Sequence, residues 1–180
     1  DERWLVPHFE KMLYDNALLS SAYVEAFQIT GEPSFAATAR ETLDYVLGRM
    51  TDPDGPFYST QDADSEGQEG KYYVWSLGEV LDVLGVDKGR NFALTYDVTA
   101  QGNWERRNIV NLPRPIAESA KSLGRDPDEL AAELAESRAK LLAARERRVP
   151  PGKDTKVLVA WNGMAIAALA QAGRALAEPR

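Results

Sequence analysis

Apolar residues recur at helical spacing over much of the chain and mark out a series of separate helices. From Phe9 to Phe27 they return every three or four positions, and Gly31 is the residue that stops the run. The spacing predicts a helix of about five to six turns that starts near Pro7, because proline suits a first turn and glycine commonly follows a last one. Its apolar stripe is wide, which favours burial against more than one neighbour.

A second helix follows after a short turn. Pro33 stands near its first position, and its apolar face reaches Met50. Two helices joined by so short a turn are expected to pack as an antiparallel αα-hairpin. Residues 51–56, which contain two prolines and a glycine, then break the helical pattern.

Further helices are predicted downstream, and several carry clear start or stop signals. Ser76 and Glu79 form a capping box, and Asp126 followed by Pro127 is a strong N-terminal signal. The predicted helices cover residues 76–85, 88–94, 116–123, 126–148 and 164–176, with an irregular segment over residues 95–115. The last helix has few charged residues before Arg174, so we expect it to be buried on most sides.

Residues 61–75 interrupt the helices with an acidic run followed by aromatic residues. The run holds Asp62, Asp64, Glu66 and Glu69 together with two glycines. Because β-prone residues flank it on both sides, the pattern predicts a β-hairpin with a loop too long for a two-residue turn. Long loops of this kind are often functional, although a solvated acidic turn would explain the same sequence.

The acidic run partly matches an EF-hand calcium loop. Asp62, Asp64, Glu66 and Gly67 fit positions 1, 3, 5 and 6, but Tyr73 stands at position 12, where a bidentate glutamate belongs. The flanks are also β-prone rather than helical. We therefore expect no EF-hand, and we predict no metal or cofactor, while weak calcium binding in another geometry stays open.

Length, charge and cysteine content narrow the class of protein. The chain has 180 residues, a net charge of −7 and no cysteine. The negative charge disfavours nucleic acid and anionic membranes as partners, and the absence of cysteine excludes disulfides and thiolate metal sites in this chain. No apolar run reaches the roughly 20 residues of a membrane span, and no signal-peptide pattern opens the chain, so we expect a cytoplasmic protein.

The alternation of helical hairpins with long polar loops indicates a fold class. We predict an all-α fold, a partial (α/α)6 toroid with a short β-hairpin insertion, because inner and outer helices alternate in this way around such a ring. Loops at one rim of the ring would build the site. The chain begins abruptly and ends directly after an apolar helix. We therefore expect residues 1–180 to be a fragment of one such barrel, truncated at both ends.

Three strings carry a family resemblance. Residues 4–16 read Trp-Leu-Val-Pro-His-Phe-Glu-Lys-Met-Leu-Tyr-Asp-Asn, residues 61–75 hold the acidic and aromatic run, and residues 156–163 read Lys-Val-Leu-Val-Ala-Trp-Asn-Gly. Together they closely resemble the thioredoxin-domain-containing, spermatogenesis-associated family. The resemblance covers nearly the whole chain, and strings this long make it specific.

The resemblance implies a thioredoxin-like domain followed by an (α/α)6 barrel similar to six-hairpin glycosidases and sugar epimerases. This chain would hold the middle of the barrel, with the thioredoxin-like domain and the remaining hairpins as its partners. The thioredoxin-like part and its cysteines are absent here, so no redox function is carried over. The family resemblance implies architecture more than a reaction.

Candidate chemistry begins with the only histidine, His8. His8, Lys11 and Asp15 fall at i, i+3 and i+7 of the predicted first helix and could serve proton transfer. The alternative is a structural ion pair between Lys11 and Asp15. Asp62 and Asp64 are candidate paired carboxylates for glycoside chemistry, which needs an acid and a base or nucleophile.

The predicted site combines these groups with aromatic walls that could stack on a sugar. The candidate catalytic residues are His8, Asp15, Asp62 and Asp64, and the candidate ligand-binding residues are Lys11, Tyr14, Glu66, Tyr72, Trp75, Trp161 and Asn162. Aromatic residues are more often core than ligand platform, and Asn162 is also a candidate helix cap, the role we favour. We expect His8, Asp15, Asp62, Asp64 and Trp161 to converge on one mouth of the helical ring.

Two functions fit this pattern. The first is a carbohydrate-active enzyme, a hydrolase or an isomerase, acting on a carbohydrate or polyol. Epimerases of this architecture use paired histidines, so a single histidine favours carboxylate chemistry or a histidine from elsewhere. The second is a non-catalytic binding or scaffold module that serves the thioredoxin-like domain, in which the charged groups would form mutual ion pairs.

Overall fold

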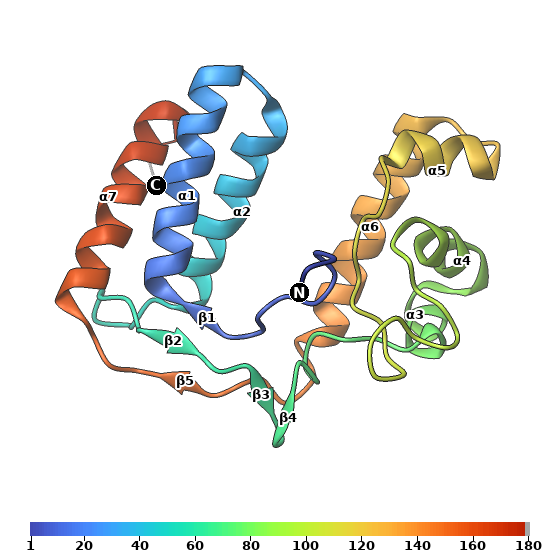
Figure 1. Cartoon of the computed structure of the whole chain (residues 1–180), viewed down its shortest axis with the longest axis horizontal. Helices are drawn as coiled ribbons and strands as arrows, with labels where there is room; N and C mark the ends of the chain where they lie inside the picture. The colour runs from blue at the N-terminus through green and yellow to red at the C-terminus, as the bar shows by residue number, and fades with distance from the viewer. Residues whose placement is uncertain (179–180) are drawn as a thin grey trace. The chain divides into compact units, whose positions relative to one another are not determined.

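The computed structural model describes residues 1–178, which are mostly helical with two small antiparallel sheets (Figure 1). The helices are α1 (Leu13–Thr30), α2 (Pro33–Arg49), α3 (Leu77–Leu84), α4 (Val86–Thr95), α5 (Ile116–Leu123), α6 (Pro127–Arg145) and α7 (Val159–Ala175). The strands are β1 (Lys11–Met12), β2 (Thr60–Gln61), β3 (Asp64–Ser65), β4 (Gln68–Glu69) and β5 (Lys153–Asp154).

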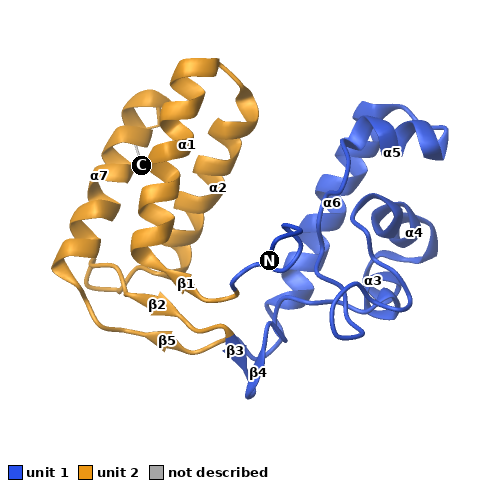
Figure 2. Cartoon of the chain, viewed as in Figure 1, with its two compact units in different colours: residues 1–8, 64–150 blue, residues 9–63, 151–180 orange. Residues whose placement is uncertain are grey.

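The chain divides into two compact units (Figure 2). Unit 1 consists of Asp1–His8 and Asp64–Pro150, and unit 2 consists of Phe9–Ala63 and Pro151–Arg180. Unit 2 therefore combines an N-terminal and a C-terminal segment of the chain, and most of unit 1 is the segment between these two. Each unit has its own hydrophobic core.

Unit 2 is built on the helical hairpin that the sequence predicts. Helices α1 and α2 pack together, and α7 lies along α1. Gly31 ends α1 in a left-handed conformation with φ 70°, and its N–H donates to the carbonyl of Phe27 at 2.8 Å. Pro33 opens α2 at its first turn. These caps confirm the predicted hairpin and both of its turn signals.

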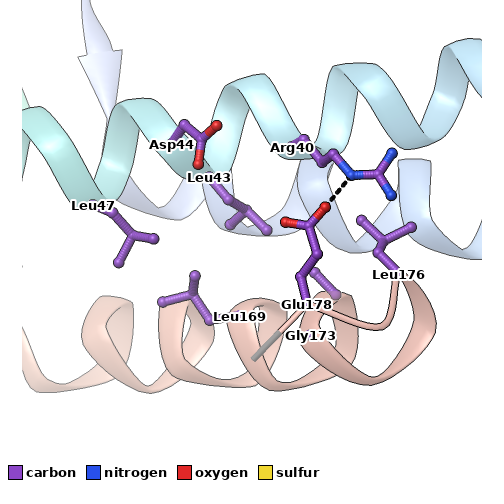
Figure 3. Close-up of a pocket in the computed structure, with 9 residues that line it drawn as sticks. Arg40, Leu43, Asp44, Leu47, Leu169, Gly173, Leu176 and Glu178 are labelled. Carbon is purple, nitrogen blue, oxygen red and sulfur yellow. Dashed lines mark hydrogen bonds and ion pairs between the residues drawn. The ribbon is translucent and has the colours of Figure 1, made fainter. Parts of the chain in front are cut away.

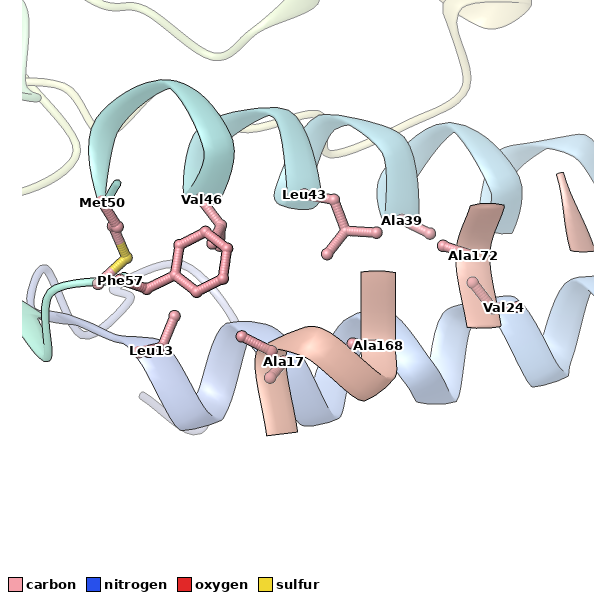
Figure 4. Packing of buried hydrophobic residues seen from close by; sticks show 11 residues of the cluster. Leu13, Ala17, Val24, Ala39, Leu43, Val46, Met50, Phe57, Ala168 and Ala172 are labelled. Atoms are coloured by element: carbon pink, nitrogen blue, oxygen red, sulfur yellow. The ribbon is translucent and has the colours of Figure 1, made fainter. Parts of the chain in front are cut away.

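The core of unit 2 lies where these three helices meet (Figure 4). Larger side chains gather at one end, where Leu13, Val46 and Met50 surround Phe57. Small alanines on α7, such as Ala168, lie in the cluster further along and let the helices approach closely. The buried cluster comprises Leu13, Ala17, Val24, Ala39, Leu43, Val46, Met50, Phe57, Ala165, Ala168 and Ala172.

The predicted start of the first helix near Pro7 is wrong. Helix α1 begins at Leu13, and the residues just before it form strand β1. Strand β1 pairs with β2, and the N–H of Leu13 donates to the carbonyl of Ser59 at 2.9 Å. The backbone N–H and C=O groups of residues 11–13 therefore bond to residues 59–61 instead of bonding within a longer helix. The spacing of apolar residues along the sequence does not predict this long-range pairing.

A three-stranded sheet stands at one end of the unit 2 helices, with β2 between β1 and β5. Thr60 lies opposite Met12 on one side and Asp154 on the other, while Gln61 lies opposite Lys11 and Lys153. Because side chains alternate between the faces of a sheet, these two rows point to opposite sides.

Asn162 joins α7 to the segment that precedes β2. Its Oδ1 accepts from the N–H of Phe57 at 2.8 Å, and its Nδ2 donates to the carbonyl of the same residue at 3.0 Å. The helix itself begins at Val159, with Leu158 as its N-cap. The helix-cap role that we favoured for Asn162 is therefore wrong, because the amide binds a partner that is 105 residues away in the chain.

Unit 1 contains α3, α4, α5 and α6, and their start and stop signals are confirmed. Both hydrogen bonds of the capping box between Ser76 and Glu79 are present, and Asp126 caps α6 by accepting from two backbone N–H groups. Gly124 ends α5 in a left-handed conformation. The core of this unit comprises Trp75, Val80, Leu84, Phe92, Ala93, Tyr96, Val98, Ala120, Leu130, Leu134 and Leu141.

The acidic run forms a tighter hairpin than the sequence predicts. Strands β3 and β4 pair within the run itself, and Glu66 and Gly67, with φ values of 54° and 73°, form a two-residue turn. The β-prone flanks do not pair with each other: β2 pairs with β1 and β5, and Trp75 pairs with Asn108. The hairpin is confirmed, but its predicted strands and its long loop are wrong.

Helix α7 is less buried than expected. Its inner side, with Ala165, Ala168 and Ala172, is buried, but Val159 is 86% exposed and Ile166 is 61% exposed. Helix α1 likewise exposes large apolar side chains, including Leu18, Leu19 and Ile29. Large apolar side chains exposed on two helices that pack together are consistent with an interface.

We expect Asn162→Ala to destabilise unit 2 by about 1–3 kcal/mol, because it leaves the N–H and carbonyl of Phe57 without their amide partner. Urea unfolding followed by tryptophan fluorescence measures the change. Gln28→Ala, at an exposed position on α1, is the control and should change the free energy of unfolding by less than about 0.5 kcal/mol. Equal effects of the two substitutions would contradict the role of Asn162.

We expect the 180-residue chain by itself to be only marginally stable and to self-associate. The apolar side chains exposed on α1 and α7 would drive association because burying them is favourable. Analytical ultracentrifugation and a thermal melt test this. A monomer that melts cooperatively at high temperature would contradict it.

Candidate functional site

One polar cleft lies within unit 2 beside the three-stranded sheet. It has a volume of about 360 Å³ and is lined by Glu10, Thr60, Asp62, Gly152, Lys153 and Asp154. Sheet register explains most of this lining. Thr60 and Asp154 lie directly opposite each other, and Glu10 and Asp62 stand one residue beyond β1 and β2, so alternation places all four on the same face.

The charges of this cleft are mainly negative. Glu10, Asp62 and Asp154 supply three carboxylates. Asp154 is held by Lys156, whose Nζ lies 2.9 Å from Oδ2 and whose N–H donates to Oδ1 at 3.1 Å. The hydrogen bonds from this side chain and this N–H hold the pKa of Asp154 below its ordinary value. The cleft therefore keeps at least this carboxylate ionised near neutral pH.

Lys11 lies on strand β1, and not on a helix as expected. Pairing with Gln61 places it on the face of the sheet opposite to Thr60 and Asp154, and its Nζ donates to the carbonyl of Phe9 at 2.7 Å. Gln61, on the same face as Lys11, accepts a hydrogen bond from the Tyr45 hydroxyl at 2.7 Å. This face of the sheet is thus tied to the helices.

The predicted helical stripe of His8, Lys11 and Asp15 is also wrong. Asp15 lies in the first turn of α1, Lys11 lies on β1, and His8 precedes both elements in the part of the chain that belongs to unit 1. Helical spacing therefore does not relate the three side chains.

Tyr14 and Trp161 form an aromatic pair in unit 2. Their ring centroids are 4.8 Å apart and the planes are tilted by 58°, with Tyr14 in the first turn of α1 and Trp161 in the first turn of α7. Both rings are half-buried. The pair joins two helix starts that are far apart in sequence, which the sequence strings themselves do not reveal.

Four of the predicted site residues lie in the acidic and aromatic stretch of unit 1. Asp64 and Glu69 lie opposite each other on the hairpin, and Glu66 pairs with Lys71 at 3.0 Å. Tyr72 packs edge-on against Tyr73 with centroids 5.0 Å apart. Glu66 is exposed, as is His8 in the N-terminal segment of the same unit.

Trp75 lies in the core of unit 1. It is 5% exposed, and the guanidinium of Arg148 lies over its ring, 4.0 Å from the centroid. Arg148 also donates to the carbonyls of Tyr72 and Val74, at 2.9 and 2.8 Å. A similar cation lies beside Tyr72, where Arg145 is 5.3 Å from the ring centroid. These rings contact arginines of the C-terminal end of α6 and the residues that follow it.

Glu79 of unit 1 binds several partners at once, and the sequence predicted only its capping role. Besides the bonds of the capping box, it accepts from Arg107 at 2.7 Å and lies 3.4 Å from Arg148. Burial alone would raise the pKa of Glu79, but hydrogen bonds from Ser76 and Arg107 outweigh it and leave the pKa below its ordinary value. The capping-box motif located Glu79, but no local signal pairs it with arginines 28 and 69 residues away.

The predicted site residues thus fall into two groups. Unit 2 holds Lys11, Tyr14, Asp15, Asp62, Trp161 and Asn162, while unit 1 holds His8, Asp64, Glu66, Tyr72 and Trp75. Contacts within each group are defined by the structure. Convergence of both groups on one mouth stays a prediction.

An apolar hollow also lies between α2 and α7 (Figure 3). Leu43, Leu47, Leu169 and Leu176 line it, and an ion pair between Arg40 and Glu178 closes one end. Its volume is about 30 Å³, which is room for a water molecule but not for a substrate. The described residues contain no group of three or more histidine, aspartate or glutamate side chains placed to hold a metal ion. Among the helices of residues 1–178, none is long and apolar enough to cross a bilayer.

Comparison with known proteins shows which proteins this chain is similar to in sequence. No family model matches the chain. The chain is similar over its full length to spermatogenesis-associated protein 20. Identity is 35% to the human protein over the whole chain and 34% to the mouse protein over 98% of it. The chain spans about a quarter of the length of these curated relatives, 26% and 25% respectively.

We expect the stability of unit 1 to fall in acid through Glu79. A carboxylate whose folded-state pKa is depressed contributes stability above its ordinary value of 4.5 and loses that contribution as pH falls through the lower folded-state pKa. Glu79→Gln should therefore flatten the dependence of urea stability on pH below 4.5. Glu41→Gln on α2 is the control for loss of one carboxylate. An unchanged pH profile in Glu79→Gln would contradict this assignment.

Proposed function

We propose that the chain is part of an (α/α)6 barrel within a longer thioredoxin-domain-containing protein, and that the polar cleft of unit 2 binds a carbohydrate or a similar polyol. The similarity of the whole chain to about a quarter of spermatogenesis-associated protein 20, 26% of the human protein, supports a place within a longer protein. The helical hairpin of α1 and α2, with α7 beside α1, supports a barrel built from hairpins. The exposed apolar side chains of α1 and α7 would then pack against the remaining hairpins.

The observation that carries this proposal is the carboxylate face of the sheet. Glu10, Asp62 and Asp154 line one cleft of about 360 Å³, a volume within the usual range of small-molecule sites. Hydroxyl groups of a sugar donate to carboxylates, and each can also accept from a neighbouring donor such as the Thr60 hydroxyl, which lies on the same face. The cleft is therefore suited to a small ligand with several hydroxyl groups.

The proposed reaction uses carboxylates. Glycoside hydrolysis needs one carboxylic acid to protonate the leaving oxygen and a second carboxylate to act as base or nucleophile. We assign Asp62 to this pair, with Glu10 as the second carboxylate of the same cleft. Asp15, His8 and Asp64 stay candidates for acid–base roles because of their side-chain chemistry. Epimerisation with paired histidines would need a second histidine from outside residues 1–180, because His8 is the only histidine of this chain.

Tyr14 and Trp161 complete the proposal as ligand-binding candidates in unit 2, whereas Lys11 lies on the sheet face opposite to the cleft and is not assigned to it. The Tyr14–Trp161 pair offers half-buried aromatic surface at the starts of α1 and α7. Asn162 has a structural task, because both ends of its amide bind Phe57. Asn162 therefore holds the segment before β2 against α7 and is not assigned to the ligand.

A second candidate function is a non-catalytic binding or scaffold module for the thioredoxin-like domain. Mutual ion pairs favour it: Glu79 binds two arginines, Glu66 pairs with Lys71, and Asp154 pairs with Lys156. A module of this kind would use its charged groups for structure. The scaffold function would be supported if substitution of the cleft carboxylates left ligand affinity unchanged.

Binding measured on the full-length protein separates the two functions. We expect Asp62→Asn to leave the fold intact and to reduce the affinity for a bound sugar at least tenfold, because the substitution removes a charge-assisted hydrogen bond. Isothermal titration calorimetry with a panel of mono- and disaccharides measures affinity, and circular dichroism checks the fold. Asp54→Asn, at an exposed turn position, is the matched control. Equal affinity of the Asp62→Asn variant and the unaltered protein would favour the scaffold function.

A further inference from the structure

A second polar cleft lies wholly within unit 1. It has a volume of about 510 Å³ and is lined by Gln68, Glu69, Lys71, Val74, Glu79, Trp104, Glu105 and Arg107. These residues come from strand β4, the turn after it, the first turn of α3 and the irregular segment before α5. None of them lines the cleft of unit 2.

The wall formed by residues 104–107 is held in an unusual conformation. Trp104 and Arg107 exchange backbone hydrogen bonds of 3.0 and 2.8 Å, and the two residues between them, Glu105 and Arg106, are left-handed with φ values of 47° and 62°. Such a conformation is uncommon outside glycine and is maintained by its surroundings. A Cβ at Gly102 would lie 2.5 Å from the carbonyl oxygen of Arg107, so only glycine fits beside this turn.

Two buried or half-buried asparagines brace the same segment. Asn108 is 1% exposed, and its side chain binds Thr99 and Trp75. Asn103 donates to the carbonyls of Asp97 and Ile109 and accepts from the N–H of Ile109. These bonds fix the long irregular segment without a helix or a sheet. The side chains that it presents to the cleft are therefore set on a rigid support.

The cleft residues outside the 104–107 turn are also held by hydrogen bonds and ion pairs. Glu79 is bound by Ser76, Arg107 and Arg148, so the carboxylate and the Arg107 guanidinium hold each other in place at 2.7 Å. Lys71 is bound to Glu66 at 3.0 Å, at a partly exposed position. Polar groups that are already fixed lose little freedom when a ligand binds.

The lining decides the class of ligand. Lys71, Arg107 and Gln68 can donate hydrogen bonds, whereas Glu69 and Glu105 accept them. The lining contains both positive and negative side chains, and Arg148 adds a further positive charge at Glu79. A strongly charged ligand would meet repulsion as well as attraction, while a neutral ligand with many hydroxyl groups can both donate and accept at each wall.

Trp104 and Val74 add apolar surface to this polar lining. An aromatic ring offers a flat, rigid area with which the C–H groups of a saturated ring can make contact. We infer that the cleft of unit 1 binds a neutral polyhydroxylated ring, a sugar or a cyclitol, between β4 and the turn of residues 104–107. This inference uses unit 1 residues alone and does not depend on the cleft of unit 2.

The test uses the full-length protein and isothermal titration calorimetry with D-glucose, cellobiose and myo-inositol as probes, each at concentrations up to tens of millimolar. We expect saturable binding of at least one probe. Trp104→Ala should weaken it about tenfold, and Glu105→Gln about threefold, because the second change keeps the shape of the side chain and removes its charge. Arg106→Gln is the matched control, since Arg106 shares the left-handed turn but does not line the cleft.

The Asp62→Asn variant separates this inference from the proposed function. Binding that is weakened by Glu105→Gln and unchanged by Asp62→Asn supports the unit 1 cleft, and the reverse result overturns it. Circular dichroism and urea unfolding show whether Trp104→Ala stays folded, and Glu105→Gln is the deciding variant if it does not. Absence of binding for all three probes, or equal effects of Glu105→Gln and Arg106→Gln, also overturns the inference.

Discussion

The backbone pairing of strand β2 on both of its edges is the constraint on which unit 2 depends. Residues 60–61 receive β1 on one side and β5 on the other, so three segments from the start, middle and end of the chain share one sheet. This pairing takes residues 11–12 out of the first helix and fixes Leu13 as its first residue. It also sets which side chains share a face, and so it brings Glu10, Asp62 and Asp154 to one cleft.

Unit 1 depends in a comparable way on one carboxylate. Glu79 caps α3 through Ser76 and at the same time binds Arg107 and Arg148. Arg148 in turn covers Trp75 and binds the carbonyls of Tyr72 and Val74. Burial lowers the pKa of Arg148, while the charge of Glu79 raises it. One ionised side chain therefore links the helix start, the aromatic segment and the long irregular loop.

The two clefts differ in the chemistry of their linings. The cleft beside the sheet is rich in carboxylates, which suits acid–base work on a hydroxylated substrate. The lining of the unit 1 cleft contains donors, acceptors and one tryptophan ring, which suits binding more than proton transfer.

Local signals in the sequence determined most of the helices of this protein and little of its site. The capping box at Ser76, the Asp126–Pro127 start and the glycine stops at Gly31 and Gly124 act within one helical turn, so their effect is readable without the fold. The sequence also located the acidic hairpin, although its tight turn at Glu66 and Gly67 depends on two left-handed residues, of which only the glycine is a strong signal.

The tertiary structure alone decided what those segments contact. The start of α1, the amide bonds of Asn162 to Phe57 and the arginines around Glu79 all join residues that are distant in sequence. Backbone groups and charges are satisfied by whichever partner the fold brings near, and that partner leaves no trace in local periodicity. The exposed apolar side chains of α7 show the same limit, because composition marks a helix as fit for burial but burial itself depends on which neighbours are present.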